Sequence, residues 1–405
     1  MPNEAARGDE SAMRHDRDDA RYVLRGPDVS PAETEPAEAE PTGTASLEAA
    51  SADQTGPPPV NGGAPGAAVA WAAGPQAPRR SGRALPIALI AAAAVLLLGV
   101  AAFATTLVIV SQQPAGNPFR DRTLFVDPDS SAARAAATSG TDEEREAAAL
   151  IAQSPAAIWL TPEQVLPGTA TAAVADLMAR AQGADALPVL VVYGITDRDC
   201  GGFSSGGLPR AAYLDWVDEI AAGLGDRTSI VVLEPDSLAL ADECPDPEAR
   251  TALVRTALAR FSDTGAEVYL DGGHSAWLPD ERMAELLTAA GVDGARGFAT
   301  NVSNAQATDD EAAYAARISD ALGGGAHAII DTSRNGAGPP PDGEWCNAPG
   351  LALGEGPHAL DDQVVDAVLW VKPPGESDGT CNGGPTAGTW WPEQAVELVA
   401  NADGR

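Results

Sequence analysis

Residues 229–237 read SIVVLEPDS, an apolar run that ends abruptly in Glu234 and Asp236. The same change from a strand-like run to polar residues recurs in the second half of the chain, at residues 189–202, 268–274, 328–336 and 368–379. Strands that deliver polar groups at their carboxyl ends are typical of an α/β barrel, whose active site lies at that end. Several carboxylates with few histidines favour acid–base chemistry on sugars.

The fold class follows from the spacing of these runs. Seven strands are predicted, at residues 156–160, 188–194, 229–234, 267–271, 297–301, 328–331 and 367–372. Amphipathic segments lie between most of them, at residues 211–224, 247–264, 279–290 and 309–322. This alternation predicts a parallel sheet. Functional groups at seven strand ends favour a distorted seven-stranded parallel β/α barrel, complete or partly open, over an open doubly wound sheet. No GxGxxG motif follows an early strand, so a dinucleotide fold lacks support.

The N-terminal part differs in composition. Residues 1–78 are rich in Ala, Pro, Gly, Glu and Asp, which predicts a disordered acidic tail. Residues 84–110 are uncharged and apolar, long enough for one transmembrane helix that acts as a signal anchor. Arginines at 79, 80 and 83 precede this span. They predict a single-pass cell-membrane protein with a cytoplasmic tail and residues 115–405 outside. Small residues at 102–104 leave release by cleavage open.

Charge and cysteine usage restrict the partners. The formal net charge of the 405-residue chain is −33, which argues against nucleic-acid binding. Four widely spaced cysteines all follow the predicted span and suggest two disulfides formed in an oxidising compartment: Cys200, Cys244, Cys346 and Cys381. Sequential pairing is the simplest arrangement, and the other two connectivities remain open. Neither CxxC nor HExxH spacing occurs, so no metal or other cofactor is expected.

These strand ends resemble the motifs of the family 6 glycoside hydrolases, cellulases that invert the anomeric carbon. Residues 193–200, YGITDRDC, are similar to the family signature Y-x-x-P-x-R-D-C, with Thr196 in place of the proline. Further blocks follow in the family's order: LEPDS, YLDGGHSAWL, GFATNVSN, DTSRNG, EWCN and WVKPPGESDG. The resemblance covers residues 115–405. It implies a catalytic domain that hydrolyses β-1,4-glucosidic bonds in cellulose or related β-glucans.

The resemblance also implies catalytic roles. Asp236 matches the general acid that protonates the leaving oxygen. Asp199 matches the aspartate beside it, which keeps the acid's pKa high and helps position water. Ser205 matches the loop serine that orients this water, and Asp378 matches the candidate base, for which proton transfer through a water chain is the alternative. Inversion implies carboxyl groups roughly 6.5–9.5 Å apart.

Sugar binding requires aromatic faces and hydrogen-bonding groups. By resemblance, three tryptophans stack on glucosyl units, Tyr193 lies near the distorted sugar, and four polar residues bind hydroxyls. The tryptophans are Trp159, Trp277 and Trp345, and the polar residues are His274, Asn301, Lys372 and Glu376. Asp271 resembles the residue that supports the acid; the alternative is that it is a structural partner of Arg198 or Arg334. Trp216 and Trp370 lie in apolar patterns and are predicted core residues.

The segments after Cys200 and Gly379 are short, which favours an open cleft and endo-acting cleavage over a roofed tunnel. Three alternatives remain: an exo-acting cellobiohydrolase, a non-catalytic glucan-binding protein on the same scaffold, and a hydrolase of another β-glucan or wall polymer. The expected partners are a β-glucan and, through one helix, the membrane.

Overall fold

The computed structural model describes residues 116–138 and 140–403. The predicted tail and the predicted span at 84–110 lie outside these ranges. Among the helices within them, none combines the length and apolar character needed to cross a bilayer.

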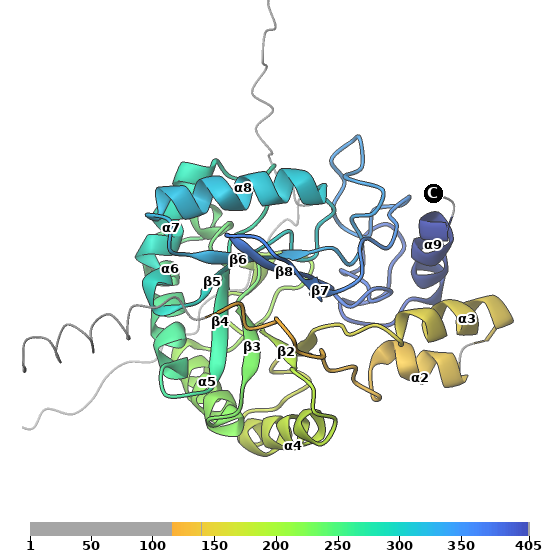
Figure 1. Cartoon of the computed structure of the whole chain (residues 1–405), viewed down its shortest axis with the longest axis horizontal. Helices are drawn as coiled ribbons and strands as arrows, with labels where there is room; N and C mark the ends of the chain where they lie inside the picture. Colours follow the sequence, from red (N-terminus) through yellow and green to blue (C-terminus); the bar gives the residue numbers. More distant parts are fainter. Residues whose placement is uncertain (1–115, 139, 404–405) are drawn as a thin grey trace, which may run out of the picture. The chain divides into compact units, whose positions relative to one another are not determined.

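The centre of the fold is a curled, mostly parallel sheet (Figure 1). The strand order is β1-β2-β3-β4-β5-β6-β8-β7, and β7 alone runs antiparallel, against β8. The strands are β1 (Ile158–Leu160), β2 (Val189–Val192), β3 (Ser229–Leu233), β4 (Ala266–Asp271), β5 (Gly297–Thr300), β6 (His327–Asp331), β7 (His358–Ala359) and β8 (Val365–Leu369). The seven predicted strands are therefore present, and the eighth is a two-residue strand too short to leave a periodic pattern.

The barrel is open between β1 and β8. Within the described ranges these two strands do not pair, although the Ala157 amide donates a hydrogen bond to the Trp370 carbonyl at 2.8 Å beside them. The sheet is accordingly a half-barrel rather than a closed one.

Helices alternate with the strands, as the sequence predicts. They are α2 (Ser131–Thr138), α3 (Asp142–Ile151), α4 (Ala170–Gly183), α5 (Arg210–Leu224), α6 (Pro247–Leu258), α7 (Asp280–Ala289), α8 (Thr308–Ala321) and α9 (Pro392–Asp403). Two begin at clear sequence signals: a capping box joins Thr141 and Glu144 before α3, and the Asp246 side chain accepts the Ala249 amide before α6. Helices α4 to α8 follow the outside of the curled sheet, whereas α2 and α3 lie near α9 (Figure 1).

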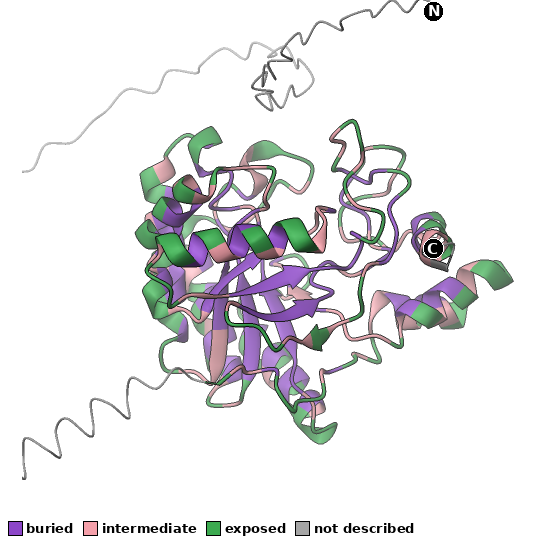
Figure 2. Ribbon diagram, turned by 45° about the horizontal axis from the view of Figure 1, so that its top comes forward, coloured by how far each residue is buried: buried purple, intermediate pink, exposed green. Residues whose placement is uncertain are grey.

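Both faces of the sheet are buried, which explains why its strands are almost continuously apolar. Outward-facing residues such as Leu190 and Leu233 pack with Trp216 of α5 in the main core. Inward-facing residues such as Val191 and Tyr269 form a second core inside the half-barrel. In Figure 2 the parallel strands are mostly buried, whereas the two-residue β7 is not, and the other exposed residues lie mainly on helices and loops. Trp216 and Trp370 are buried, which confirms their predicted place in the core.

Candidate active site

The carboxyl ends of the parallel strands carry an unusual backbone. Several non-glycine residues there have left-handed φ angles, and four of them are Asp199 at 59°, Glu234 at 52°, Asp236 at 65° and Asn301 at 64°. Such conformations are costly and persist where the surrounding structure imposes them, often at functional sites. Two of the four are predicted catalytic aspartates, so the strand ends hold these carboxylates in an imposed geometry.

Asp236 lies just beyond β3, half-buried, with its amide donating to Asp271 Oδ1 at 3.0 Å. Burial raises the pKa of Asp236 well above its ordinary value, and the negative charges of Asp271 and Asp199 raise it further. A carboxyl group that retains its proton near neutral pH can act as a general acid. The geometry therefore suits the role that the sequence assigns to Asp236.

Asp271 supports this environment from the end of β4. Its Oδ1 also accepts the Gly273 amide at 3.0 Å, while its buried Oδ2 has no hydrogen-bond partner in the described part of the chain. Burial raises the pKa of Asp271 to about 7. The two arginines named as alternative structural partners of Asp271 form their ion pairs elsewhere, Arg198 with Glu163 and Arg334 with Asp378.

Asp199 lies on the loop after β2. Ser204 donates to Asp199 Oδ2 from its amide at 2.8 Å and from its hydroxyl at 3.1 Å, and this hydroxyl is 2.8 Å from the Tyr193 hydroxyl. Gly202 is required beside this carboxylate, since a Cβ there would lie 2.4 Å from Asp199 Oδ2. Ser205, the next residue, is exposed, and its role in orienting water stays a prediction. Nothing in the sequence distinguishes the two serines.

Asp378 faces a positive environment. Its carboxylate accepts from Arg334 Nη1 at 2.7 Å and from the Asn347 amide at 2.8 Å, and Lys372 Nζ lies 3.4 Å from it. Burial alone would raise the pKa of Asp378, but the charges of Arg334 and Lys372 outweigh it and hold this pKa below its ordinary value. Asp378 is thus ionised under conditions in which Asp236 keeps its proton.

Several predicted substrate residues gather near β1 and β8. Trp159 meets the Tyr193 ring edge-on, with centroids 5.2 Å apart, and Lys372 Nζ lies 5.8 Å from the Trp159 ring centroid. Glu376 Oε1 accepts a hydrogen bond from Ser131 of α2 at 2.6 Å. These contacts form a continuous row from Tyr193 through Trp159 to the seam of the half-barrel.

A second group lies toward β4 and the loop around Trp345. The rings of His274 and Trp277 are 5.3 Å apart, and His274 Nδ1 accepts the Ala276 amide at 3.3 Å. Burial lowers the pKa of His274 to about 4, so near neutral pH its Nε2 carries the proton and can donate. Trp345 is 37% exposed, and its ring centroid lies 6.0 Å from that of Phe203 on the Asp199 loop.

The sequential pairing of the cysteines is confirmed. Disulfides join Cys200 to Cys244 and Cys346 to Cys381. The first directly follows Asp199, and the second spans the segment that contains Asp378. Each catalytic loop is therefore tied to a neighbouring segment beside its carboxylate.

The model of the glycosyl hydrolases family 6 matches residues 119–402. The chain belongs to this family. It is 46% identical over 281 residues to Endoglucanase A of Cellulomonas fimi. This match covers 69% of this chain and 61% of that protein. Endoglucanase 1 of Streptomyces halstedii is 39% identical, and the match covers 68% of this chain and 88% of that protein. The chain thus spans about three-fifths of the length of the Cellulomonas relative.

A solved family 6 structure is also similar. It is the endoglucanase Cel6 from Mycobacterium tuberculosis in complex with methyl-cellobiosyl-4-deoxy-4-thio-β-D-cellobioside. The two chains are 44% identical with a TM-score of 0.68, and the match covers 71% of this chain and all of the other. The predicted membership of the family and the half-barrel fold agree with this likeness.

Within this family 6 site, Asn301 has a role that its polarity did not reveal. Its amide nitrogen donates to the carbonyls of Gln306 and Asp331, and its Oδ1 accepts the Gln306 amide. Both donors are therefore occupied by backbone, and the side chain orders the turn after β5. Asp331 is buried similarly, accepting backbone amides that include those of Ser303 and Lys372.

The sequence also gave no separate signal for Asn347, which holds the family 6 base candidate from two sides. Its backbone N–H donates to the Asp378 carboxylate, and its side-chain Oδ1 accepts the backbone N–H of Asp378 at 2.8 Å.

In residues 116–138 and 140–403, no three His, Cys, Asp or Glu side chains are grouped so as to hold a metal ion.

Proposed function

We propose that this protein is an endo-acting β-1,4-glucanase that hydrolyses cellulose or a related β-glucan with inversion. One observation carries the proposal: one site holds a carboxyl group with a raised pKa, Asp236, and a carboxylate with a lowered pKa, Asp378. Titratable groups driven apart in this way divide the acid and base roles between them. The endoglucanase relatives support the same activity.

In the proposed mechanism, Asp236 protonates the glycosidic oxygen as the bond to the anomeric carbon breaks. A water attacks that carbon from the opposite face, and its proton passes to Asp378, directly or through other water. Asp199 keeps the proton on Asp236 through its negative charge. Tyr193 and Trp159 support the sugar on one side of the broken bond, and Trp277 and Trp345 support the chain on the other side.

We propose further that residues 84–110 anchor the chain in the cell membrane and that the hydrolase region lies outside. The two disulfides support this placement, because such bonds persist in oxidising compartments. Residues 1–78 would then form the cytoplasmic tail.

The activity is tested by incubating the full chain in detergent with carboxymethyl cellulose and with cellohexaose. We expect the viscosity of the polymer to fall early and proton NMR to show the α-anomer first. Early β-anomer would contradict inversion, and cellobiose released without a fall in viscosity would contradict endo cleavage. Binding without turnover would instead support a glucan-binding protein.

The pH dependence tests the role of Asp271. Because Asp236 acts in its protonated form, activity is lost as pH rises through its raised pKa. Asp271→Asn removes a neighbouring negative charge while its Oδ1 can still accept the Asp236 amide. We therefore expect the alkaline limb of kcat/KM to move to lower pH. The control is Asp263→Asn, an exposed carboxylate just before the amino end of β4, whereas Asp271 lies at its carboxyl end; for this variant the limb should stay in place.

A further inference from the structure

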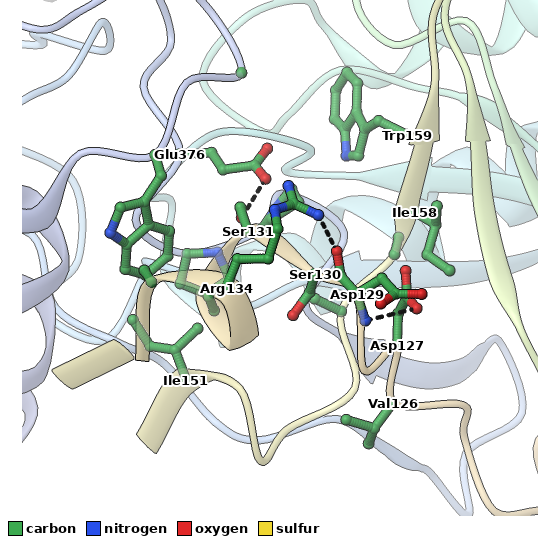
Figure 3. A pocket seen from close by; sticks show the side chains of 18 of the residues that line it. Val126, Asp127, Asp129, Ser130, Ser131, Arg134, Ile151, Ile158, Trp159 and Glu376 are labelled. Atoms are coloured by element: carbon green, nitrogen blue, oxygen red, sulfur yellow. Dashed lines mark hydrogen bonds between the residues drawn. The ribbon is translucent and has the colours of Figure 1, made fainter. Parts of the chain in front are cut away.

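A cavity of about 660 Å³ lies beside the predicted substrate residues (Figure 3). Trp159 and Glu376 form part of its wall, whereas the acid Asp236 and its neighbour Asp199 do not. The remaining wall comes from the segment around α2, from β1 and from the loop before α9. Its volume falls in the range of roughly 300–1,000 Å³ that is usual for ligand sites.

The cavity continues the row of sugar-binding residues. Tyr193 meets Trp159 edge-on at 5.2 Å, and Trp159 in turn lines the cavity. A glucan chain that passes from the aspartates across Tyr193 to Trp159 would therefore enter this space next. The cavity itself provides the room for it, since Ile158 and Trp159 of β1 line one part of its wall and Pro373 and Glu376, after β8, line another.

The wall has the chemistry that a glucosyl unit needs. Trp159 and Trp390 supply aromatic surface, and the buried Nε1 of Trp390 has no hydrogen-bond partner among the described residues. Polar groups come from Ser130, Ser131 and Arg134. In Figure 3 the Arg134 guanidinium lies between the Glu376–Ser131 pair and Asp129, to whose carbonyl it donates one hydrogen bond, and its other donors can meet sugar hydroxyls.

We infer that this cavity binds at least one further glucosyl unit of a β-glucan, beyond the unit at Trp159, on the side away from Asp236. The inference rests on the proposed function and extends its site. A polymer held on this side as well as at Trp277 and Trp345 would be bound along its interior, as endo cleavage requires. Remote binding of this kind is realised as a higher kcat/KM for longer substrates.

The test compares cellohexaose with cellotetraose on the full chain. Wild type should show a kcat/KM ratio, hexaose to tetraose, of roughly tenfold, the gain expected from binding energy remote from the reacting bond. Ser154→Trp places an indole in the cavity wall and should reduce the ratio to near one. Because a ratio is independent of the active fraction, partial misfolding does not imitate this result. Arg134→Ala should lower the ratio less, and Ser262→Trp, on an exposed residue near β4, should leave it unchanged.

A wild-type ratio near one, or a ratio that Ser154→Trp does not change, overturns the inference while hydrolysis itself stands. If wild type hydrolyses neither oligosaccharide, the proposed function fails separately. In that case the same comparison is made with dissociation constants from calorimetry. Equal constants for both lengths, or for wild type and Ser154→Trp, would then reject the extra subsite.

Discussion

Asp236→Asn should reduce kcat on cellohexaose by about 100- to 10,000-fold, the usual contribution of a general acid. An amide at this position cannot donate the proton that the departing sugar oxygen requires. A substrate whose leaving group is a nitrophenolate tests the acid role more directly, because nitrophenolate departs without being protonated. We expect 2,4-dinitrophenyl β-cellobioside to retain much more of its wild-type rate than cellohexaose does.

The matched control is Asp197→Asn, two residues before Asp199 on the same loop. Asp197 is exposed and shares the left-handed backbone, with φ at 50°, which asparagine tolerates. Its substitution should leave both rates within about twofold, since surface changes of this kind have small effects. If Asp236→Asn lowered the rates on both substrates by the same factor, the loss would come from damage to the structure and not from the missing acid.

Asp378→Asn should combine loss of activity with loss of stability. The substitution removes the proposed base and leaves the buried Arg334 guanidinium without its carboxylate partner. Breaking a buried ion pair from one side costs about 3–5 kcal/mol. Denaturant unfolding should therefore show a large fall in the free energy of unfolding, and kcat should fall by at least about 100-fold.

The stability change should depend on pH in a defined direction. The pKa of Asp378 is lower in the folded chain than its ordinary value of about 4, so its charge stabilises the fold above that pH. This contribution is lost as pH falls through the folded pKa. The difference between wild type and Asp378→Asn should be largest near neutral pH and shrink in acid.

Two further variants separate the effects. Asp361→Asn breaks an exposed ion pair with Arg120 and should cost about 0–1 kcal/mol. The double variant Asp378→Asn with Arg334→Met also removes the Arg334 charge, so stability should recover in part, because Lys372 still faces position 378, while activity should not recover. Recovery of activity in the double variant would show that Asp378 acts only by neutralising Arg334.

The strands and the acid–base residues were predictable because each has a local signal. An apolar run that ends in Glu234-Pro-Asp236 identifies a buried strand and the polar group it presents. The predicted cysteine pairing also follows the chain order. The two-residue β7 and the opening beside β1 lack such signals, because they depend on how the sheet curls as a whole.

The partners of the carboxylates were harder to predict because they come from distant segments. Ser204 and Ser205 are equivalent in sequence, and only the loop geometry brings Ser204 to Asp199. Asn301 has the composition of a sugar ligand, yet backbone groups occupy its amide. Asn347 reaches Asp378 across 31 residues of chain. Sequence patterns identify which groups exist, whereas the folded backbone decides which of them are available to substrate.

The two disulfides lie in the loops that carry the proposed catalytic carboxylates. Neither bond lies in the sheet, and each ties down a loop next to a proposed catalytic carboxylate. Loss of either bond raises the entropy of the unfolded chain and lowers the free energy of unfolding by about 3–4 kcal/mol. The contacts of the apolar strands and helices in the folded chain do not change. Reduction would leave the hydrogen bonds to Asp199 and Asp378 in place but remove the covalent tie beside each carboxylate. Under the membrane placement that we propose, both bonds would form only after the hydrolase region has crossed the membrane, in an oxidising compartment.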